Sequence, residues 1–470
     1  MKTKSMIFGI AVISSLTLMA ADTPEVENVV MTQAQFGRMV TVTYKLKNAS
    51  AGAVITFDVE TNTLADASGE WVSIGGEAVC NAKGAVWRKV TTADADSEGK
   101  YTITWRPDLS WEGHKVSLAD GGARAVVTAW ALDNTPDYMV VDISAGAKPN
   151  TQRYYTSTNF LPGGLLGNPD YRTSSLVMRK ILAKDVTWTM GSSNVETKRV
   201  TDGREDTHKV TLTNNYYIGV FPVTQAQWAQ VAANSSIRAW FTREAAYRPM
   251  ESVCYCDIRT GVNTDSIDLN YAWPSNPCPS SYLGILRDRV GLDFDLPSEA
   301  QWEFAARAGN GTGYWGRSGF DIKNIGNDSN LSVLGRYQYN GGKVGANHED
   351  EPEQDCGVEN GTAIVGTYLP NDWGIYDMHG NVFEICLDLY EKDIAVAMDA
   401  EGNPYNGRTN VNPSNPEYTL SGSRSSSRVG RGGSWKTQAT NSRPAARVSY
   451  TFDNRTNNYG FRLVCTAGLK

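Results

Sequence analysis

A series of short motifs rich in glycine and aromatic residues most constrains how this 470-residue chain can fold. Glycine adopts tight-turn conformations without strain, and a neighbouring tryptophan or tyrosine can anchor the turn in a core. The sequence therefore predicts a domain of short strands and long, pinned loops. In chain order the motifs are Thr189-Met-Gly-Ser, Tyr217-Ile-Gly-Val-Phe-Pro-Val-Thr, Leu296-Pro-Ser-Glu-Ala-Gln-Trp-Glu, Tyr314-Trp-Gly, Asn371-Asp-Trp-Gly-Ile-Tyr-Asp-Met-His-Gly-Asn-Val-Phe-Glu, Arg431-Gly-Gly-Ser-Trp and Asn458-Tyr-Gly-Phe-Arg-Leu-Val.

Two helices are predicted between these motifs. One begins after Thr224, a good N-cap residue, and continues into a helix-favouring run. The other begins after Ser298, and Gln301 stands three residues later, which is the spacing of a capping box. Gly309 marks its end, because glycine at that position ends a helix in the left-handed conformation.

The whole series of motifs, taken in order, resembles the formylglycine-generating enzyme family, also called the sulfatase-modifying factor family. The resemblance covers residues 178–468 and implies an α+β, C-type-lectin-like fold with little regular secondary structure. The same family also contains non-catalytic binding proteins, so the fold alone does not decide the function.

The residues before this domain have a different character. Residues 1–21 combine a basic start, a short apolar run and small residues at the exit, which predicts a secretory signal peptide and an extracytoplasmic protein, at the cell surface, in the periplasm or secreted. Residues 22–145 alternate apolar and polar side chains, which predicts a small all-β sandwich. Residues 146–177 are rich in Gly, Pro, Asn, Ser and Thr and are interpreted as a linker.

Charge and cysteine content limit the classes of partner and site. The net charge of −7 disfavours nucleic acid as a partner, because phosphate binding needs clustered Lys and Arg. No later stretch is apolar enough to cross a bilayer, so an integral membrane protein is not expected. The chain has seven cysteines, and one or two disulfides are expected among the six that follow residue 250.

The segment after Arg431 bears on catalysis. In the oxidases that the chain resembles, this segment carries two redox-active cysteines that bind copper. The first thiol position corresponds to Thr437 here, and the second falls at about Ser442. Hydroxyl groups hold Cu(I) poorly, since this soft ion selects thiolates. Copper is therefore not expected as a cofactor, and no catalytic residue is predicted.

A calcium site is the metal site that the resemblance supports. The matching ligands are Asp377, Gly380, Val382 and Glu384, which offer side-chain and main-chain oxygens suited to a hard cation. The alternative is a turn in which Asp377 caps the backbone and Glu384 pairs with an arginine.

A binding groove is also implied by the resemblance. Ser434, Arg447 and Asn458 match residues that line the family's peptide groove, Trp435 lies beside them, and Phe383 replaces the usual tryptophan of the groove wall. Each could be structural instead: Ser434 in a turn, Arg447 in a buried ion pair and Asn458 as a clasp between loops.

Three functions remain open at this stage. The first is a non-catalytic module, stabilised by calcium, that binds a peptide, a protein surface or a glycan with residues between Ser434 and Asn458. The second is an oxidoreductase acting on a thiol substrate, as in sulfatase maturation. The third is a structural surface protein with a vestigial cleft.

Overall fold

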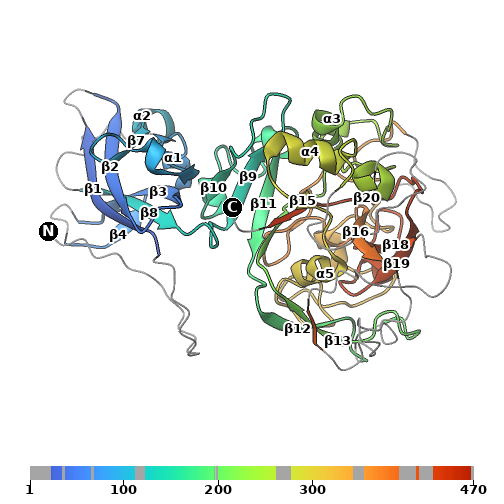
Figure 1. The fold of residues 1–470 in the computed structure, drawn as a ribbon. Coiled ribbons are helices and arrows are strands. Elements are labelled where there is room, and N and C mark those ends of the chain that lie inside the picture. Colours follow the sequence, from blue (N-terminus) through green and yellow to red (C-terminus); the bar gives the residue numbers. More distant parts are fainter. Residues whose placement is uncertain are drawn as a thin grey trace.

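The computed structural model describes residues 23–33, 37–64, 68–111, 122–194, 196, 199–260, 277–341, 354–390, 409–411 and 427–466. The chain forms two lobes that lie side by side (Figure 1). The predicted signal peptide at residues 1–21 lies outside the described part. Within that part no helix is both long enough and apolar enough to cross a membrane.

The first lobe is a sandwich of two antiparallel sheets, as the alternating pattern predicts. Along β2, Val40, Val42 and Tyr44 are buried, whereas Thr41 and Thr43 are less so, because successive side chains of a strand point to opposite faces. One sheet has the order β1 (Glu25–Gln33), β2 (Val40–Lys47), β7 (Tyr101–Trp105), β5 (Lys83–Gly84); the other contains β4 (Trp71–Ser73), β3 (Ala53–Asn62), β6 (Lys89–Val90) and β8 (Ala123–Trp130), which also pairs with β3. Short helices α1 (Gly76–Val79) and α2 (Pro107–Ser110) close one end.

The second lobe is α+β and loop-rich, which confirms the predicted fold class. Its largest sheet has the order β10 (Arg153–Tyr155), β9 (Tyr138–Asp142), β11 (Ser175–Ile181), β14 (Tyr216–Gly219), β21 (Val464–Thr466), β15 (Phe294–Asp295). The other two sheets contain β12 (Val186–Met190), β13 (His208–Leu212) and β17 (Thr409–Val411), and then β19 (Arg447–Thr451), β18 (Ser427–Arg431), β16 (Phe383–Leu389) and β20 (Tyr459–Gly460). The helices are α3 (Gln225–Val231), α4 (Tyr282–Val290), α5 (Glu299–Arg307) and α6 (Leu331–Leu334).

Both predicted helices form with their predicted N-caps, whereas the left-handed C-cap of α5 is Ala308, one residue before the predicted Gly309. Thr224 caps α3, and its side chain and that of Gln227 bond each other's backbone in a capping box. Ser298 and Gln301 do the same for α5. These reciprocal bonds satisfy backbone N–H groups that a helix start otherwise leaves open.

The predicted domain boundaries need correction. Strand β9 was expected to end the first domain, but it pairs with β11 of the second lobe from Asp142 to Tyr138. Residues 146–177 are not a free linker either, since they contain β10, two 3₁₀ helices, η3 (Thr158–Phe160) and η4 (Pro169–Arg172), and the start of β11.

These ordered residues join the two lobes through one apolar core. The buried side chains of Tyr155, Leu161 and Phe221 belong to the same cluster as the sandwich interior. Trp87 of the first lobe stacks on Tyr155 at 5.2 Å between ring centroids, and its carbonyl oxygen accepts a hydrogen bond from the N–H of Tyr154. A shared core of this kind holds the lobes in a fixed relation.

The expected disulfides do not form in this structure. No disulfide links any two of the seven cysteines, and Cys386 on β16 and Cys465 on β21 are both buried. Burial raises the pKa of the Cys386 thiol well above its ordinary value.

Candidate functional site

Helix α5 supplies the buried acidic foundation of the site. Glu303 pairs with Arg307 one turn later and with Arg431 at the end of β18, and both oxygens are buried. Although burial alone would raise it, the pKa of Glu303 falls to about 2 because these two guanidinium groups favour the carboxylate. Arg431 is thereby fixed, and so is the turn that follows it.

That turn places a Gly-Gly pair against the helix. Gly432 and Gly433 have φ angles of 89° and 76°, a conformation that favours glycine. A Cβ on Gly432 would stand 2.9 Å from the ring of Trp302 on α5. The motif therefore contains glycine because the backbone approaches a buried tryptophan closely while turning left-handed.

Both positions predicted for thiols lie against the peptide unit that follows. The Thr437 hydroxyl accepts the N–H of Ser434 at 2.9 Å and donates to the Ser434 carbonyl at 3.1 Å, which closes a local turn. The Ser442 side chain is fully buried and touches Gly433. The Thr437 hydroxyl thus bonds the N–H of the Gly433–Ser434 peptide unit, and the Ser442 hydroxyl lies against Gly433.

The His379 ring stabilises this turn through two hydrogen bonds. Its Nε2 accepts the N–H of Gly316 at 3.1 Å, so Nδ1 carries the proton and donates to the Ser442 carbonyl at 3.0 Å. Burial lowers the pKa of His379 to about 4, and the ring is neutral at physiological pH. These two hydrogen bonds give His379 a structural role in the turn.

The predicted groove residues come together, but beneath the surface. Ser434 and Asn458 are buried, with their side chains 3.5 Å apart, and Trp435 donates from Nε1 to the Asn457 carbonyl at 2.9 Å. Phe383 donates its N–H to the Asn458 carbonyl at 2.8 Å and stacks on Tyr459. These contacts match the structural alternatives for both residues: Asn458 connects two loops, and Ser434 lies in a turn.

Arg447 is not a groove residue in this structure. Its guanidinium forms a two-pronged ion pair with Glu299 of α5, and both side chains are buried. Arg443 is held in the same manner by Glu196 at 2.8 Å and Glu205 at 2.7 Å. The buried-ion-pair alternative is therefore correct for Arg447, and these arginines fasten the C-terminal segment rather than contact a ligand.

The two carboxylates predicted to bind calcium both have hydrogen-bond partners in the protein. Glu384 accepts hydrogen bonds from Arg462 at 2.7 and 2.9 Å and from Trp302 Nε1 at 2.7 Å, so both its oxygens are engaged. Asp377 accepts the N–H of Gly366 at 2.8 Å and the side chain of Asn381 at 3.2 Å. Burial raises the pKa of Asp377 to about 6.

The remaining two predicted ligands, Gly380 and Val382, are buried within the same turn. Over the described ranges, no three His, Cys, Asp or Glu side chains converge into a metal site. The hydrogen bonds of Glu384 match the alternative in which an arginine supplies the positive charge. Calcium binding through the Gly380 and Val382 carbonyls stays a prediction.

The surface above the buried groove residues is the loop Lys436–Asn441. The Thr437 carbonyl accepts the N–H of Gln338 at 3.0 Å, and Thr440 donates its N–H to the Ile325 carbonyl at 2.9 Å. Gln438 is exposed, and Lys436 lies over the ring of Trp435. The loop is therefore held at both ends and presents short polar side chains outward. The loop lies within the range from Ser434 to Asn458 in which the sequence predicts binding residues.

Phe241 also supports the loop through Trp435, and the sequence did not predict this contact. Its ring meets Trp435 edge to face at 5.4 Å between centroids. Its N–H donates to Glu251 Oε1 at 2.9 Å, and Glu251 is fully buried. Burial raises the pKa of Glu251 to about 7 despite this bond.

Glu251 makes stability depend on pH. Because its folded pKa exceeds the ordinary value of 4.5, its stabilising contribution is present below pH 4.5 and is lost as pH rises through 7. The Glu251→Gln variant is expected to unfold at a similar denaturant concentration to the parent at pH 4.5 and to be more stable at pH 8, by up to about 3 kcal/mol. Urea unfolding at several pH values measures this, with the exposed Glu70→Gln as control. An equal offset at every pH would contradict the assignment.

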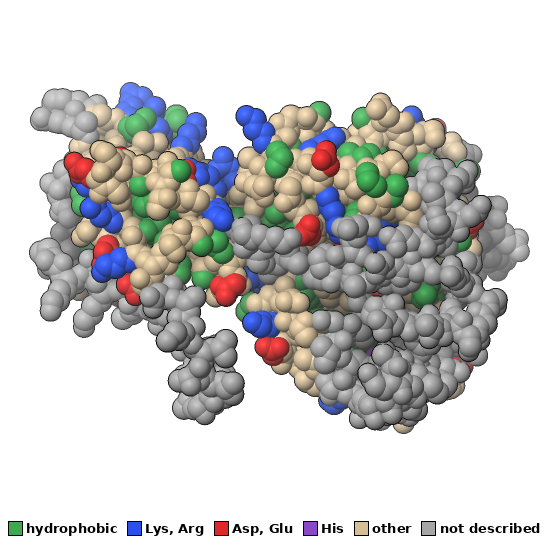
Figure 2. All heavy atoms as spheres, viewed as in Figure 1, with side chains coloured by type: hydrophobic (Ala, Val, Ile, Leu, Met, Phe, Trp, Pro, Cys, Tyr) green, Lys and Arg blue, Asp and Glu red, His purple; other side chains and the backbone are tan. Residues whose placement is uncertain are grey.

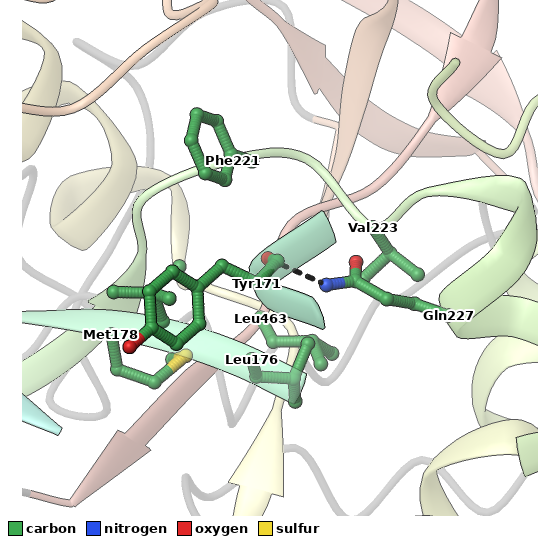
Figure 3. A pocket seen from close by; sticks show the side chains of 9 residues that line it. Tyr171, Leu176, Met178, Phe221, Val223, Gln227 and Leu463 are labelled. Carbon is green, nitrogen blue, oxygen red and sulfur yellow. Dashed lines mark hydrogen bonds between the residues drawn. The ribbon is translucent and has the colours of Figure 1, made fainter. Parts of the chain in front are cut away.

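A small cavity lined by residues of β11 and α3 has no room for a ligand. Figure 3 shows the side chains that line it, among them Tyr171, Met178 and Phe221, and the hydrogen bond from Gln227 to the Tyr171 carbonyl. Its volume is about 10 Å³, room for no more than a single water.

Comparisons with known proteins agree with the sequence motifs. Residues 174–467 match the sulfatase-modifying factor enzyme 1-like domain. The chain is 32% identical over 174 residues to a formylglycine-generating enzyme of Thermomonospora curvata, covering 36% of this chain and 48% of that protein. It is 26% identical over 253 residues to the chaperone protein LppX of Paenibacillus barcinonensis, covering 51% of this chain and 75% of that protein.

The chain thus spans about half the length of the formylglycine-generating enzyme that it matches. Among solved structures, Treponema denticola variable protein 1 is similar over 62% of this chain and 95% of its own length, with 23% sequence identity and a TM-score of 0.40.

Proposed function

Because the chain belongs to the sulfatase-modifying factor family over residues 174–467, we propose that it is a non-catalytic member that recognises a peptide or protein surface. The observation that carries this proposal is the pair of hydroxyl side chains, Thr437 and Ser442, at the positions predicted for thiols. Thr437 uses its hydroxyl in a local turn. Ser442 keeps its hydroxyl buried. Neither is a ligand for a soft metal.

The loop Lys436–Asn441 is the proposed recognition surface. Short polar side chains and nearby aromatic ones supply adaptable hydrogen bonds and flat contact area, as binding loops do. Tyr339, which is 50% exposed, lies near the loop. Gly326 connects the two: its carbonyl accepts the N–H of Ala439, and its Cα lies next to the Tyr339 hydroxyl. Buried ion pairs and Trp435 hold the loop from below, so it can bind with little loss of conformational freedom.

The proposal includes export of the protein from the cytoplasm. The basic start and apolar run of residues 1–21 support secretion, and the site would then meet partners outside the cytoplasm. A glycan remains a second class of ligand for the loop. The other candidate activity is oxidation of a thiol substrate, which identity to a protein named formylglycine-generating enzyme favours.

Binding through the loop can be tested with peptides selected from a random display library against the whole protein. A Lys436→Ala/Gln438→Ala/Asn441→Ala variant is expected to bind the selected peptides at least about tenfold more weakly, since each lost contact removes on the order of 1 kcal/mol. The matched control is Lys83→Ala/Glu70→Ala, two exposed residues of the first lobe. Equal binding by both variants would mean that the loop is not the recognition surface.

A further inference from the structure

A cavity of about 620 Å³ lies between the two lobes. One wall is the turn at Ile74–Glu77 that leads into α1 of the first lobe, and the opposite wall is the segment Pro370–Tyr376 of the second. Its volume lies in the range of sites that hold small ligands, which occur preferentially between domains. The cavity is separate from the loop Lys436–Asn441, and none of that loop's residues lines it.

The walls of the cavity are fixed and the interior is open. Gly76 packs so closely on the backbone of Asn159 that a Cβ there would overlap it, which locks α1 to η3. In contrast, a Cβ built on Gly75 or Gly164 meets no atom within 4 Å. The space therefore exists before a ligand arrives, and a ligand would not need to separate the lobes.

The polar side chains of the cavity are not engaged elsewhere. Within the described residues, no hydrogen bond or ion pair involves the side chains of Glu77, Thr158 or Asn159, or the phenol groups of Tyr138 and Tyr376. The two phenols interact electrostatically, since Tyr138 contributes to the raised pKa of Tyr376 after the larger effect of burial. Glu77 and Asn159 are exposed, so these donors and acceptors are available to bond water or a ligand that displaces it.

The chemistry of the lining selects an uncharged ligand. Glu77 is the one charged residue among the lining residues, and no Lys, Arg or His is present to hold an anion. A cation is also disfavoured, because the Arg179 guanidinium already lies 5.1 Å from the centre of the Tyr138 ring. Aromatic faces beside amide, carboxylate and hydroxyl groups fit a molecule with apolar C–H faces and many hydroxyls.

We propose that this cavity binds a neutral oligosaccharide. The rings of Tyr138 and Tyr376 contact its C–H faces, and their phenol groups bond its hydroxyl groups together with Asn159, Thr158 and Glu77. This site does not depend on the proposed function of the loop, and either could exist without the other.

The test uses the full-length protein and calorimetric titration with neutral trisaccharides of glucose, mannose, galactose and xylose. At least one is expected to bind with Kd below about 1 mM, and the Asn159→Ala and Tyr138→Phe variants are each expected to bind it about tenfold more weakly. Both changes are small and remove no described hydrogen bond, so folding is retained. The matched control, Asn441→Ala in the loop, is expected to bind the sugar as the parent does.

Three results would overturn the proposal. They are the absence of binding by all four trisaccharides, unchanged binding by Asn159→Ala and Tyr138→Phe, and stronger binding of sialyllactose or choline than of any neutral sugar. Loss of peptide binding in the loop variant with sugar binding intact would show that the two sites are separate.

Discussion

Replacement of Arg462 by methionine is expected to destabilise the second lobe by about 3–5 kcal/mol. The Arg462 side chain is fully buried, and it donates to Glu384, to the Gly219 carbonyl and to the Tyr376 carbonyl. Methionine removes the cation and leaves the Glu384 carboxylate buried with Trp302 as its remaining partner. An uncompensated buried charge is far more costly than the pair itself is favourable. Urea unfolding at pH 7 measures the loss.

A double variant and an exposed ion pair serve as controls for Arg462→Met, and a chelator tests the alternative that Glu384 binds calcium. A Glu384→Gln/Arg462→Met double variant is expected to be less destabilised than the sum of the single changes, because the charge has gone with its partner. Arg124→Met, which breaks the exposed pair with Glu60, is expected to change stability by no more than about 1 kcal/mol. A calcium chelator is expected to leave the parent transition unchanged. If instead the chelator lowers it while Arg462→Met does not, Glu384 binds a metal ion and the ion-pair account is wrong.

The second large effect concerns copper. The Thr437→Cys/Ser442→Cys variant is expected to withdraw one Cu(I) per chain from a chromogenic Cu(I) chelator, whereas the parent leaves the complex intact. Both side chains lie against the Gly433–Ser434 peptide unit, and thiolates select Cu(I) because sulfur is soft and polarisable. The turn that holds these positions is already built by Arg431, Trp302 and His379.

The parent is an internal control for the other thiols, since it contains all seven natural cysteines. Thr440→Cys/Ser449→Cys adds two thiols on the same segment, one in the 3₁₀ helix Ala439–Ser442 and one exposed on β19, and it is expected to behave as the parent does. Copper uptake by the parent, or equal uptake by both double variants, would contradict the assignment of the two positions.

Local patterns were sufficient to predict the helix starts, the sandwich and the overall family fold. A capping box such as Ser298 with Gln301 joins residues close in sequence, so it can be recognised without knowing the rest of the chain. Strand pairing is not local. The sequence of β9 reads as one more strand of the sandwich, and only its pairing with β11 assigns it to the second lobe.

The roles of the site residues were predicted less well, because the same residue type can contact a ligand or form a buried ion pair. Glu384 and Arg447 have the chemistry of a metal ligand and a groove residue, and equally that of buried ion pairs. Which purpose holds depends on burial and on partners such as Arg462 and Glu299, which are far away in sequence. The assignment of the family's two thiol positions to Thr437 and about Ser442 rests on residue order in the sequence and stays a prediction.

The inter-lobe cavity had no signal in the sequence. Its walls come from segments about 300 residues apart, Ile74–Glu77 and Pro370–Tyr376, and the motif that begins at Asn371 gives no sign of a partner segment in the first lobe. The segment between the lobes, interpreted as a linker from its Gly and Pro content, supplies Thr158 and Asn159 to the cavity. Composition could not reveal that these residues pack on both lobes.

Mass spectrometry of a cysteine-containing peptide incubated with the copper-supplied parent protein in oxygenated buffer tests the central claim most directly. We expect the peptide to be recovered with its cysteine unconverted, because the side chains at 437 and 442 offer oxygen rather than sulfur. Formation of a formylglycine aldehyde, beyond that seen with copper alone, would contradict the claim that this chain binds without oxidising.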